Sequence, residues 1–199
     1  MRVLMVTSAT PGEGKTTMAM HLAAVLAQAG SRVLLVDADL RRPRVHTILG
    51  LDRGPGLSEL LEGREPKPVR QTEIPGISVI TAGRTPADPG ALLGGMELEA
   101  LLADLGQDFD CVILDSAPVL GLADAPVIST KVDAVLLVAA ADGAPRAAVR
   151  DSVKRLRLVR APLVGALLNR VDFKRDGYGY YGSHYYSYGP SDDSTSAAG

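Results

Sequence analysis

The chain has 199 residues, of which 46% are hydrophobic, and a formal net charge of −2 at pH 7. A chain of this length and composition can bury the core of one globular domain without help from metals or disulfides, and its single cysteine, Cys111, excludes a disulfide within the chain. The small net charge argues against nucleic acid as a partner, and no apolar run approaches the roughly 18 residues of a membrane-spanning helix. We therefore expect a cytoplasmic domain, with Cys111 as a buried, inert thiol in an apolar run.

Apolar, β-rich runs alternate with helical patterns along the chain. The predicted strands cover residues 3–7, 32–36, 77–81, 111–114, 134–139 and 163–168. The predicted helices cover residues 15–28, 57–61, 97–105, 123–129 and 145–159. This alternation predicts an α/β fold, with a mostly parallel central sheet and helices on both faces. The strands are continuously hydrophobic, so we expect both faces of each to be buried, and we expect a loop over residues 63–76.

The first motif lies between the first predicted strand and the first predicted helix. It is the octet Ala9-Thr10-Pro11-Gly12-Glu13-Gly14-Lys15-Thr16, a phosphate-binding loop with Ala in place of the leading Gly. Its glycines let backbone N–H groups turn toward phosphate oxygens, Lys15 would neutralise the outer phosphates, and Thr16 would bind magnesium. The predicted nucleotide-binding residues of this segment are Pro11, Gly12, Glu13, Gly14, Lys15, Thr16 and Thr17.

Two further motifs place carboxylates after buried strands. Asp37 and Asp39 follow the second predicted strand, and Asp115 follows the fourth. In open α/β sheets ligands bind at the carboxyl ends of the strands, and magnesium prefers carboxylate oxygens. Acidic residues there can also cap a turn or remain solvated, but the phosphate-binding loop at the same edge favours a catalytic role. Lys15, Thr16, Asp37, Asp39 and Asp115 together form a complete phosphoryl-transfer set.

The composition changes after residue 175. Beyond it the hydrophobic pattern stops, and Gly, Ser, Tyr and Asp predominate, which predicts a folded domain over 1–175 and a flexible tail over 176–199. All 6 tyrosines of the chain lie in this tail, at Tyr178, Tyr180, Tyr181, Tyr185, Tyr186 and Tyr188. Such a tail can be merely disordered, but a phosphate-binding loop in the same chain makes its phenols natural phosphoryl acceptors.

The three motifs, in this order and followed by the tyrosine-rich tail, resemble the cytoplasmic kinase domain of the bacterial tyrosine kinases that control capsule and exopolysaccharide synthesis. Their Walker A, A′ and B motifs would be residues 9–16, 33–41 and 112–118. Related partition and septum-positioning ATPases carry a signature lysine where this chain has Thr10, and this difference favours the kinases. The resemblance implies a P-loop NTPase fold and an ATP- and Mg²⁺-dependent kinase that phosphorylates its own tail tyrosines, between subunits.

The resemblance also implies roles for particular residues. Asp37 would receive the tyrosine proton or orient the phenol, Asp39 would assist, and Asp115, with Thr16 and Asp37, would hold magnesium. Asn169 and Arg170 would contact the adenine. Asn169-Arg170-Val171-Asp172 also invites comparison with the Asn-Lys-x-Asp motif of GTPases, although Arg replaces the Lys.

The resemblance implies partners as well. One is a transmembrane chain-length-determinant adaptor, in the same or a separate polypeptide, and another is a cognate phosphotyrosine phosphatase. The chain would also associate with other copies of itself, which in the family form a ring. The implied location is the inner face of the cell membrane. Family members carry a Glu- and Arg-rich helix before the first strand, whereas this sequence opens on the strand itself. An excised domain and a domain that depends on a separate adaptor both remain open. A nucleotide-dependent assembly switch, with the tail as an interaction surface, is the alternative function.

A basic stripe follows helical spacing in the last predicted helix. It consists of Arg146, Arg150, Lys154 and Arg157. Such a stripe is usually a solvated face, and contact with anionic headgroups or an acidic adaptor segment is the functional alternative.

Overall fold

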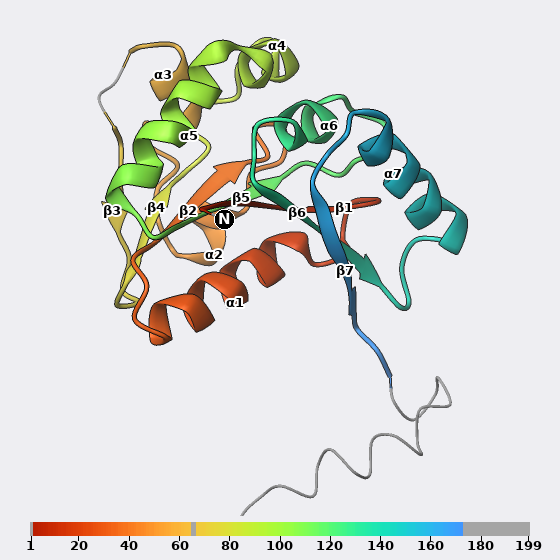
Figure 1. The fold of residues 1–199 in the computed structure, drawn as a ribbon. Coiled ribbons are helices and arrows are strands. Elements are labelled where there is room, and N and C mark those ends of the chain that lie inside the picture. Colours follow the sequence, from red (N-terminus) through yellow and green to blue (C-terminus); the bar gives the residue numbers. More distant parts are fainter. Residues whose placement is uncertain (1, 65–66, 173–199) are drawn as a thin grey trace, which may run out of the picture.

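The computed structural model describes residues 2–64 and 67–172, and within them the chain forms a seven-stranded sheet in the order β3-β4-β2-β5-β1-β6-β7 (Figure 1). The strands are β1 (Val3–Ser8), β2 (Val33–Ala38), β3 (Arg70–Gln71), β4 (Ile77–Ile80), β5 (Cys111–Ser116), β6 (Ala134–Ala140) and β7 (Leu163–Asn169). Only β3 pairs antiparallel among these described strands, so the predicted mostly parallel sheet is confirmed. The predicted tail, residues 176–199 with its tyrosines, lies outside the described residues.

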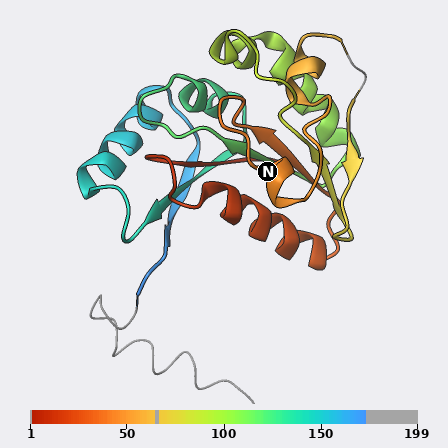
Figure 2. The same ribbon diagram turned by 180° about the vertical axis from the view of Figure 1, so that it is seen from behind.

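Helices cover both faces of the sheet, as predicted. They are α1 (Lys15–Gln28), α2 (Val45–Ile48), α3 (Leu57–Leu61), α4 (Pro89–Gly94), α5 (Met96–Asp108), α6 (Asp124–Ser129) and α7 (Arg146–Leu158). Opposite views show α1 on one side of the sheet and α4 to α7 on the other (Figures 1 and 2). Val45 of α2 packs in the core cluster that contains Ala19 and Ala23 of α1, whereas Leu98 and Leu156 belong to the cluster on the other face. The core is therefore two apolar layers separated by the sheet.

Three short elements were not expected from the sequence. The helix α2 and the strand β3 are too short to show a periodic pattern, and β3 lies in the segment 63–76 that was predicted to be a loop. The helix α4 does carry a local signal, because Asp88 accepts a hydrogen bond from the Ala91 N–H and Pro89 occupies the first turn. Cys111 was expected to be buried but is only half-buried at the start of β5, and this burial raises the pKa of its thiol.

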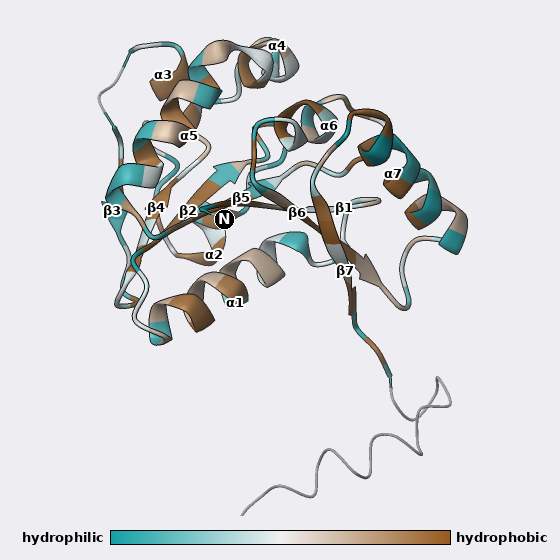
Figure 3. Ribbon diagram, in the orientation of Figure 1, coloured by the Kyte–Doolittle hydropathy of each residue, from teal (hydrophilic) through white to brown (hydrophobic). Residues whose placement is uncertain are grey.

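The prediction that every strand is buried on both faces is wrong for β7. This strand is an edge of the sheet in the described part of the chain, and its hydrophobic residues (Figure 3) include Val164 and Leu168, which are 61% and 55% exposed. Its continuous hydrophobicity resembles that of the central strands, but neither a further strand nor a closely packed helix of the described chain covers it. Apolar surface is therefore available beside β6 and the start of α7.

The carboxyl ends of the central strands meet at one edge of the sheet. The phosphate-binding loop connects β1 to α1, and Asp37 of β2 stands directly opposite Asp115 of β5 in the strand register. Parallel pairing of β1 with β5 and of β5 with β2 thus brings the three sequence motifs together.

Candidate functional site

The loop after β1 adopts a conformation that depends on its glycines. Gly12 and Gly14 have φ of 85° and 93°, in the left-handed region that residues with a Cβ rarely adopt. A Cβ on Gly14 would also lie 2.2 Å from Nδ2 of Asn169. Glycine at both positions lets the backbone N–H groups of the loop turn inward at the N-terminus of α1, an arrangement suited to an anion.

Glu13 braces this loop from behind. Its side chain is 1% exposed; one oxygen accepts the Thr10 N–H at 2.7 Å and the other accepts the Ala140 N–H of β6 at 3.4 Å. The Asn169 amide donates to the Glu13 carbonyl oxygen at 3.0 Å, so the end of β7 also holds the loop. Of the predicted nucleotide-binding residues, Glu13 therefore directs its carboxylate away from the cavity, and only its backbone is available to a phosphate.

Lys15 lies among carboxylates at the mouth of the loop. Its Nζ is 3.0 Å from Oδ2 of Asp39 and 3.6 Å from Oδ1 of Asp115. Burial alone would lower the pKa of this lysine, but the Asp115 and Asp39 carboxylates outweigh that effect and the pKa is raised. Lys15 is therefore a permanent cation, and a phosphate group would compete with these carboxylates for it.

Asp115 is the least satisfied polar group of the site. It is fully buried, and neither carboxylate oxygen has a hydrogen-bond partner among the described residues. Burial raises its pKa to about 6, and nearby Lys15 opposes this shift. A buried carboxylate that has an ion pair with Lys15 but accepts no hydrogen bond, beside a phosphate-binding loop, fits a water bound to magnesium. The described residues contain no group of three or more His, Cys, Asp or Glu side chains that could hold a metal ion by themselves.

Asp37 contributes to the local fold as well as to the charge of the site. Its Oδ2 accepts the N–H groups of Arg44 and Val45, at 3.1 and 3.0 Å, and its Oδ1 accepts the Asp39 N–H at 3.3 Å. The carboxylate therefore caps the start of α2. Burial, with Asp115 nearby, raises its pKa to about 7. Capping, one of the interpretations open from the sequence, is thus present, and the catalytic role of Asp37 stays a prediction.

A cavity of about 650 Å³ opens over the loop. Its wall includes most of the predicted site, namely Pro11, Gly12, Gly14, Lys15, Thr16, Thr17, Asp39 and Arg170. Arg41, Arg42 and Arg44 also line it. The guanidinium of Arg41 forms a two-pronged ion pair with buried Asp124, at 2.7 and 3.1 Å. Sequence reasoning missed Arg42, Arg44 and Asp124; the basic run after Asp39 is a signal for the first two, but nothing in the sequence links Asp124 to Arg41.

The buried Asp115 carboxylate predicts an unusual pH dependence of stability. Its folded-state pKa of about 6 lies above its ordinary value of 3.8, so the folded chain retains a proton that the unfolded chain has lost. Its contribution to stability is full below the ordinary value and is lost as the pH rises through about 6. Asn cannot ionise, and we therefore expect Asp115→Asn to stabilise the nucleotide-free protein by roughly 1–3 kcal/mol near pH 8 and by about half as much near pH 5.

Urea unfolding without magnesium at the two pH values measures this difference. Asp104→Asn, which changes an exposed carboxylate paired with Lys67, is the matched control and should show little pH-dependent gain. An Asp115→Asn chain that is no more stable than the parent near pH 8 would contradict the assignment of a destabilising buried charge.

Known proteins share this chain's sequence over most of its length. The ParA family model, described as the NUBPL iron-transfer P-loop NTPase, matches residues 1–181. Tyrosine-protein kinase YwqD of Bacillus subtilis (strain 168) is 36% identical over 186 residues, which are 92% of this chain and 78% of that protein. The putative tyrosine-protein kinase EpsB of Ralstonia solanacearum is 35% identical over 94% of this chain, but the chain spans only 25% of that protein.

The fold is shared with a solved kinase domain. The kinase domain of Escherichia coli tyrosine kinase ETK superposes with a TM-score of 0.83 and 37% identity, over 85% of this chain and 68% of that chain. In the described part of this chain no helix is long and apolar enough to cross a membrane. The matches, the phosphate-binding loop and the carboxylates around it lead to one assignment: the chain belongs to the bacterial tyrosine-protein kinases, a group of ParA-like P-loop NTPases.

Proposed function

We propose that this chain transfers the γ-phosphoryl group of ATP to tyrosines of its own tail, residues 176–199. The observation that carries the proposal is the cluster of Lys15, Asp39 and Asp115 at the mouth of the phosphate-binding loop, in which Asp115 is ion-paired with Lys15 but accepts no hydrogen bond. This cluster supplies a cation for phosphates and carboxylate oxygens for a hydrated metal. All 6 tyrosines of the chain lie in the tail, which gives such a site a dense set of acceptors.

Each residue around the loop has a separate proposed role in phosphoryl transfer. The loop amides and Lys15 would bind the β- and γ-phosphates, and Thr16 and Asp115 would hold magnesium, which leaves the Asp37 carboxylate for the acceptor phenol. Bound Mg²⁺ would supply charge neutralisation on the phosphate oxygens. Because phosphoryl transfer passes through a loose transition state, positioning and charge neutralisation contribute more than full deprotonation of the phenol.

Asp37 has a pKa that suits it to accept the proton of the acceptor tyrosine. As the phenol oxygen bonds to the γ-phosphorus and the bond to ADP breaks, the phenol proton has to leave. A carboxylate with a pKa of about 7 is ionised enough to accept it near neutral pH, and Asp39 lies next to it in the site. We assign this acceptor role to Asp37.

The end of β7 is proposed to select the base. The Asn169 side chain offers both a donor and an acceptor, and it already contacts the loop through Glu13. We expect ATP to bind more tightly than GTP, and Asn169→Ala to reduce this preference by about tenfold, a loss of one or two hydrogen bonds. Competition between the two nucleotides for a fluorescent analogue measures it. Tighter binding of GTP by the parent chain would instead revive the GTPase interpretation of residues 169–172.

The acceptor tail is proposed to come from a neighbouring molecule. The chain between Arg170 and Tyr178 can extend about 27 Å, so reach alone does not forbid a molecule from modifying itself. The preference for a neighbour follows from the self-association proposed for the family, with a ring as its form. Each phosphate adds about −1.5 to −2 charges near neutral pH, so modified tails would repel one another and the carboxylate-lined site. Phosphorylation should therefore weaken assembly.

The proposed kinase would act in a membrane-associated regulatory system. We propose that it works at the inner face of the cell membrane with a transmembrane chain-length-determinant adaptor, on the same or a separate polypeptide. The phosphorylation state would regulate polymerisation and export of a capsular or extracellular polysaccharide, and a phosphotyrosine phosphatase would reverse it.

A mixing experiment tests transfer between molecules. A Lys15→Met chain is combined with an active chain whose 6 tail tyrosines are all replaced by Phe, so that each lacks what the other supplies. Phosphate on the Lys15→Met tail demonstrates transfer between molecules. Absence of label in this mixture would refute it, if the parent chain alone labels itself at a rate independent of protein concentration. ATP-dependent assembly without any label in either arrangement would favour the nucleotide-dependent switch.

A further inference from the structure

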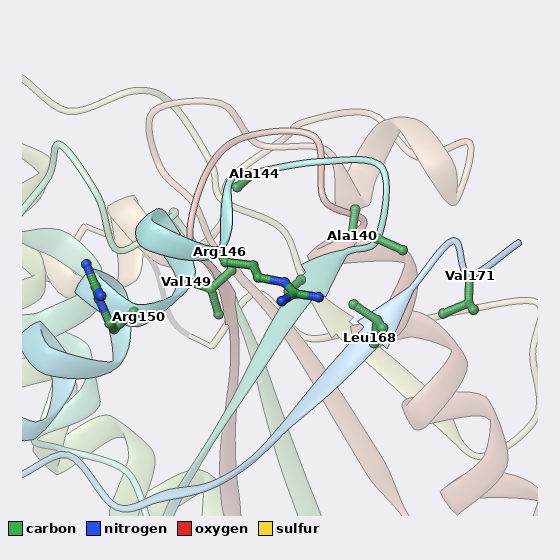
Figure 4. A pocket seen from close by; sticks show the side chains of 9 residues that line it. Ala140, Ala144, Arg146, Val149, Arg150, Leu168 and Val171 are labelled. Atoms are coloured by element: carbon green, nitrogen blue, oxygen red, sulfur yellow. The ribbon is translucent and has the colours of Figure 1, made fainter. Parts of the chain in front are cut away.

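A second cavity lies on the other side of β6 from the phosphate-binding loop. It measures about 620 Å³, is open to solvent, and is bordered by the segment between β6 and α7, the first turns of α7 and the end of β7 (Figure 4). Its apolar wall consists of Ala139, Ala140, Ala141, Ala144, Val149, Leu168 and Val171. Leu168 is 55% exposed, although it is a large hydrophobic residue paired in the sheet with buried Ala139. This cavity therefore presents an apolar floor that the described chain leaves uncovered.

Two arginines are the charged groups of this cavity. Arg146 extends from the start of α7 across the cavity toward Leu168, and Arg150 lies one turn further along the helix (Figure 4). No acidic side chain lines the cavity among the described residues, and none of them forms an ion pair with Arg146. Arg150 has only a loose, exposed pair with Asp151 at 3.9 Å. The positive end of α7 adds to the charge, so the cavity is suited to an anion.

The combination of an apolar floor and arginines specifies the kind of anion. A free phosphate would use the Arg146 guanidinium but would leave the apolar wall uncovered. An aromatic ring that carries a phosphate would cover Leu168 and Val149 with its ring and place the phosphate at Arg146, whose planar donors match phosphate oxygens. Phosphotyrosine has this chemistry.

The path of the chain supplies such a group at the right place. Val171 lines the cavity, and the sequence continues from there, a few residues later, into the tail with its tyrosines. A tether this short gives an effective concentration on the order of millimolar, so that even weak binding would be occupied. We propose that this cavity binds a phosphotyrosine of the chain's own tail, residues 176–199. The inference rests on the proposed function for the origin of the phosphate.

A lipid surface fits this site less well. The rest of the basic stripe, Lys154 and Arg157, is exposed on α7 but does not line the cavity, and the apolar floor is concave rather than a protruding face. A membrane would meet the outward cations first, whereas a single side chain can enter the cavity. Docking of the modified tail here would keep it out of the kinase sites of neighbouring molecules.

Synthetic peptides test the docking without relying on kinase activity. The probes are fluorescent peptides of residues 176–190, each with one phosphotyrosine, the unphosphorylated peptide, and a peptide phosphorylated at Ser183 only. They are titrated by fluorescence anisotropy against the full, phosphatase-treated chain. We expect a phosphotyrosine peptide to bind at least about fivefold more tightly than the unphosphorylated and the phosphoserine peptides, because only it supplies both ring and phosphate.

Variants locate the binding. Arg146→Gln should weaken the phosphotyrosine peptide by about tenfold, and Leu168→Ser should weaken it several-fold, whereas Arg157→Gln, a change on the same helix outside the cavity, should have little effect. Unfolding curves confirm that each variant is folded, and Arg146 is exposed enough for its replacement to leave the fold unaffected. Equal losses with Arg146→Gln and Arg157→Gln would overturn the proposal in favour of diffuse charge attraction.

Two further outcomes would also overturn it. If phosphotyrosine and phosphoserine peptides bind alike, the apolar floor has no role. If vesicles with anionic lipid bind the chain in an Arg146-dependent manner while the peptides do not, the surface is a membrane contact. Because the phosphate is introduced by synthesis, a chain without kinase activity could still bind the peptide, so failure of the proposed function and failure of this inference are separable.

Discussion

Replacement of Lys15 by Met is expected to suppress phosphotyrosine formation strongly and to weaken binding of ATP. Among the described residues, Lys15 is the one whose cationic side chain pairs with both Asp39 and Asp115 at the loop. Removing a preorganised charge that meets the transferred phosphate costs about 10²–10³ in rate. Methionine has a similar length and no charge, so the substitution tests the ammonium rather than the packing.

The measurement is phosphate incorporation per chain with Mg·ATP, together with nucleotide affinity. Lys154→Met, which removes an exposed lysine on α7, is the matched control and should behave like the parent. Since Lys15 is buried among carboxylates, an unfolding curve must show that the variant is folded. Undiminished phosphorylation by a folded Lys15→Met chain would rule out this site.

Asp37→Asn is expected to slow phosphorylation by about 10²–10⁴, the usual contribution of a general base. Asn retains an oxygen that can accept from the Arg44 and Val45 N–H groups, so the start of α2 should survive. The carboxylate with a pKa of about 7 is lost, and with it the proposed proton acceptor. A pH–rate profile is the most informative readout, because the parent rate should fall as the pH drops below about 7, and the variant should lack this limb.

Asp115→Asn provides the comparison for this result. It should also suppress turnover, but chiefly through a higher requirement for magnesium, because Asp115 is the carboxylate of the site whose oxygens accept no hydrogen bond. Asp104→Asn should change neither quantity. If Asp37→Asn and Asp115→Asn both run at the parent rate, the two carboxylates are structural, and the hydrogen bonds of Asp37 to α2 are its whole role.

The central sheet was predictable because each central strand is an apolar run bounded by turn residues. The positions of Lys15, Asp39 and Asp115 at one edge followed from parallel pairing, and the structure brings their side chains together. The edge strand β7 was not predictable in the same way. Its apolar run is indistinguishable from that of a central strand, and only its position in the sheet exposes Val164 and Leu168.

The direction of individual side chains was beyond the sequence. Within the loop motif, nothing distinguishes a Glu13 that faces a nucleotide from the observed one, which turns inward to the Thr10 and Ala140 N–H groups. The Ala140 contact joins residues distant in sequence and depends on the packing of β6 against the loop. Likewise, the hydrogen bonds of Asp37 to α2 require a helix too short to be predicted.

Intact-mass measurement of the purified chain after incubation with Mg·ATP tests the central claim most directly. The account predicts additions of whole phosphate groups, up to 6 per chain, that peptide mapping places on the tail tyrosines and that Lys15→Met strongly suppresses. Turnover of ATP with no mass added to the chain, or phosphate that maps entirely outside residues 176–199, would contradict it.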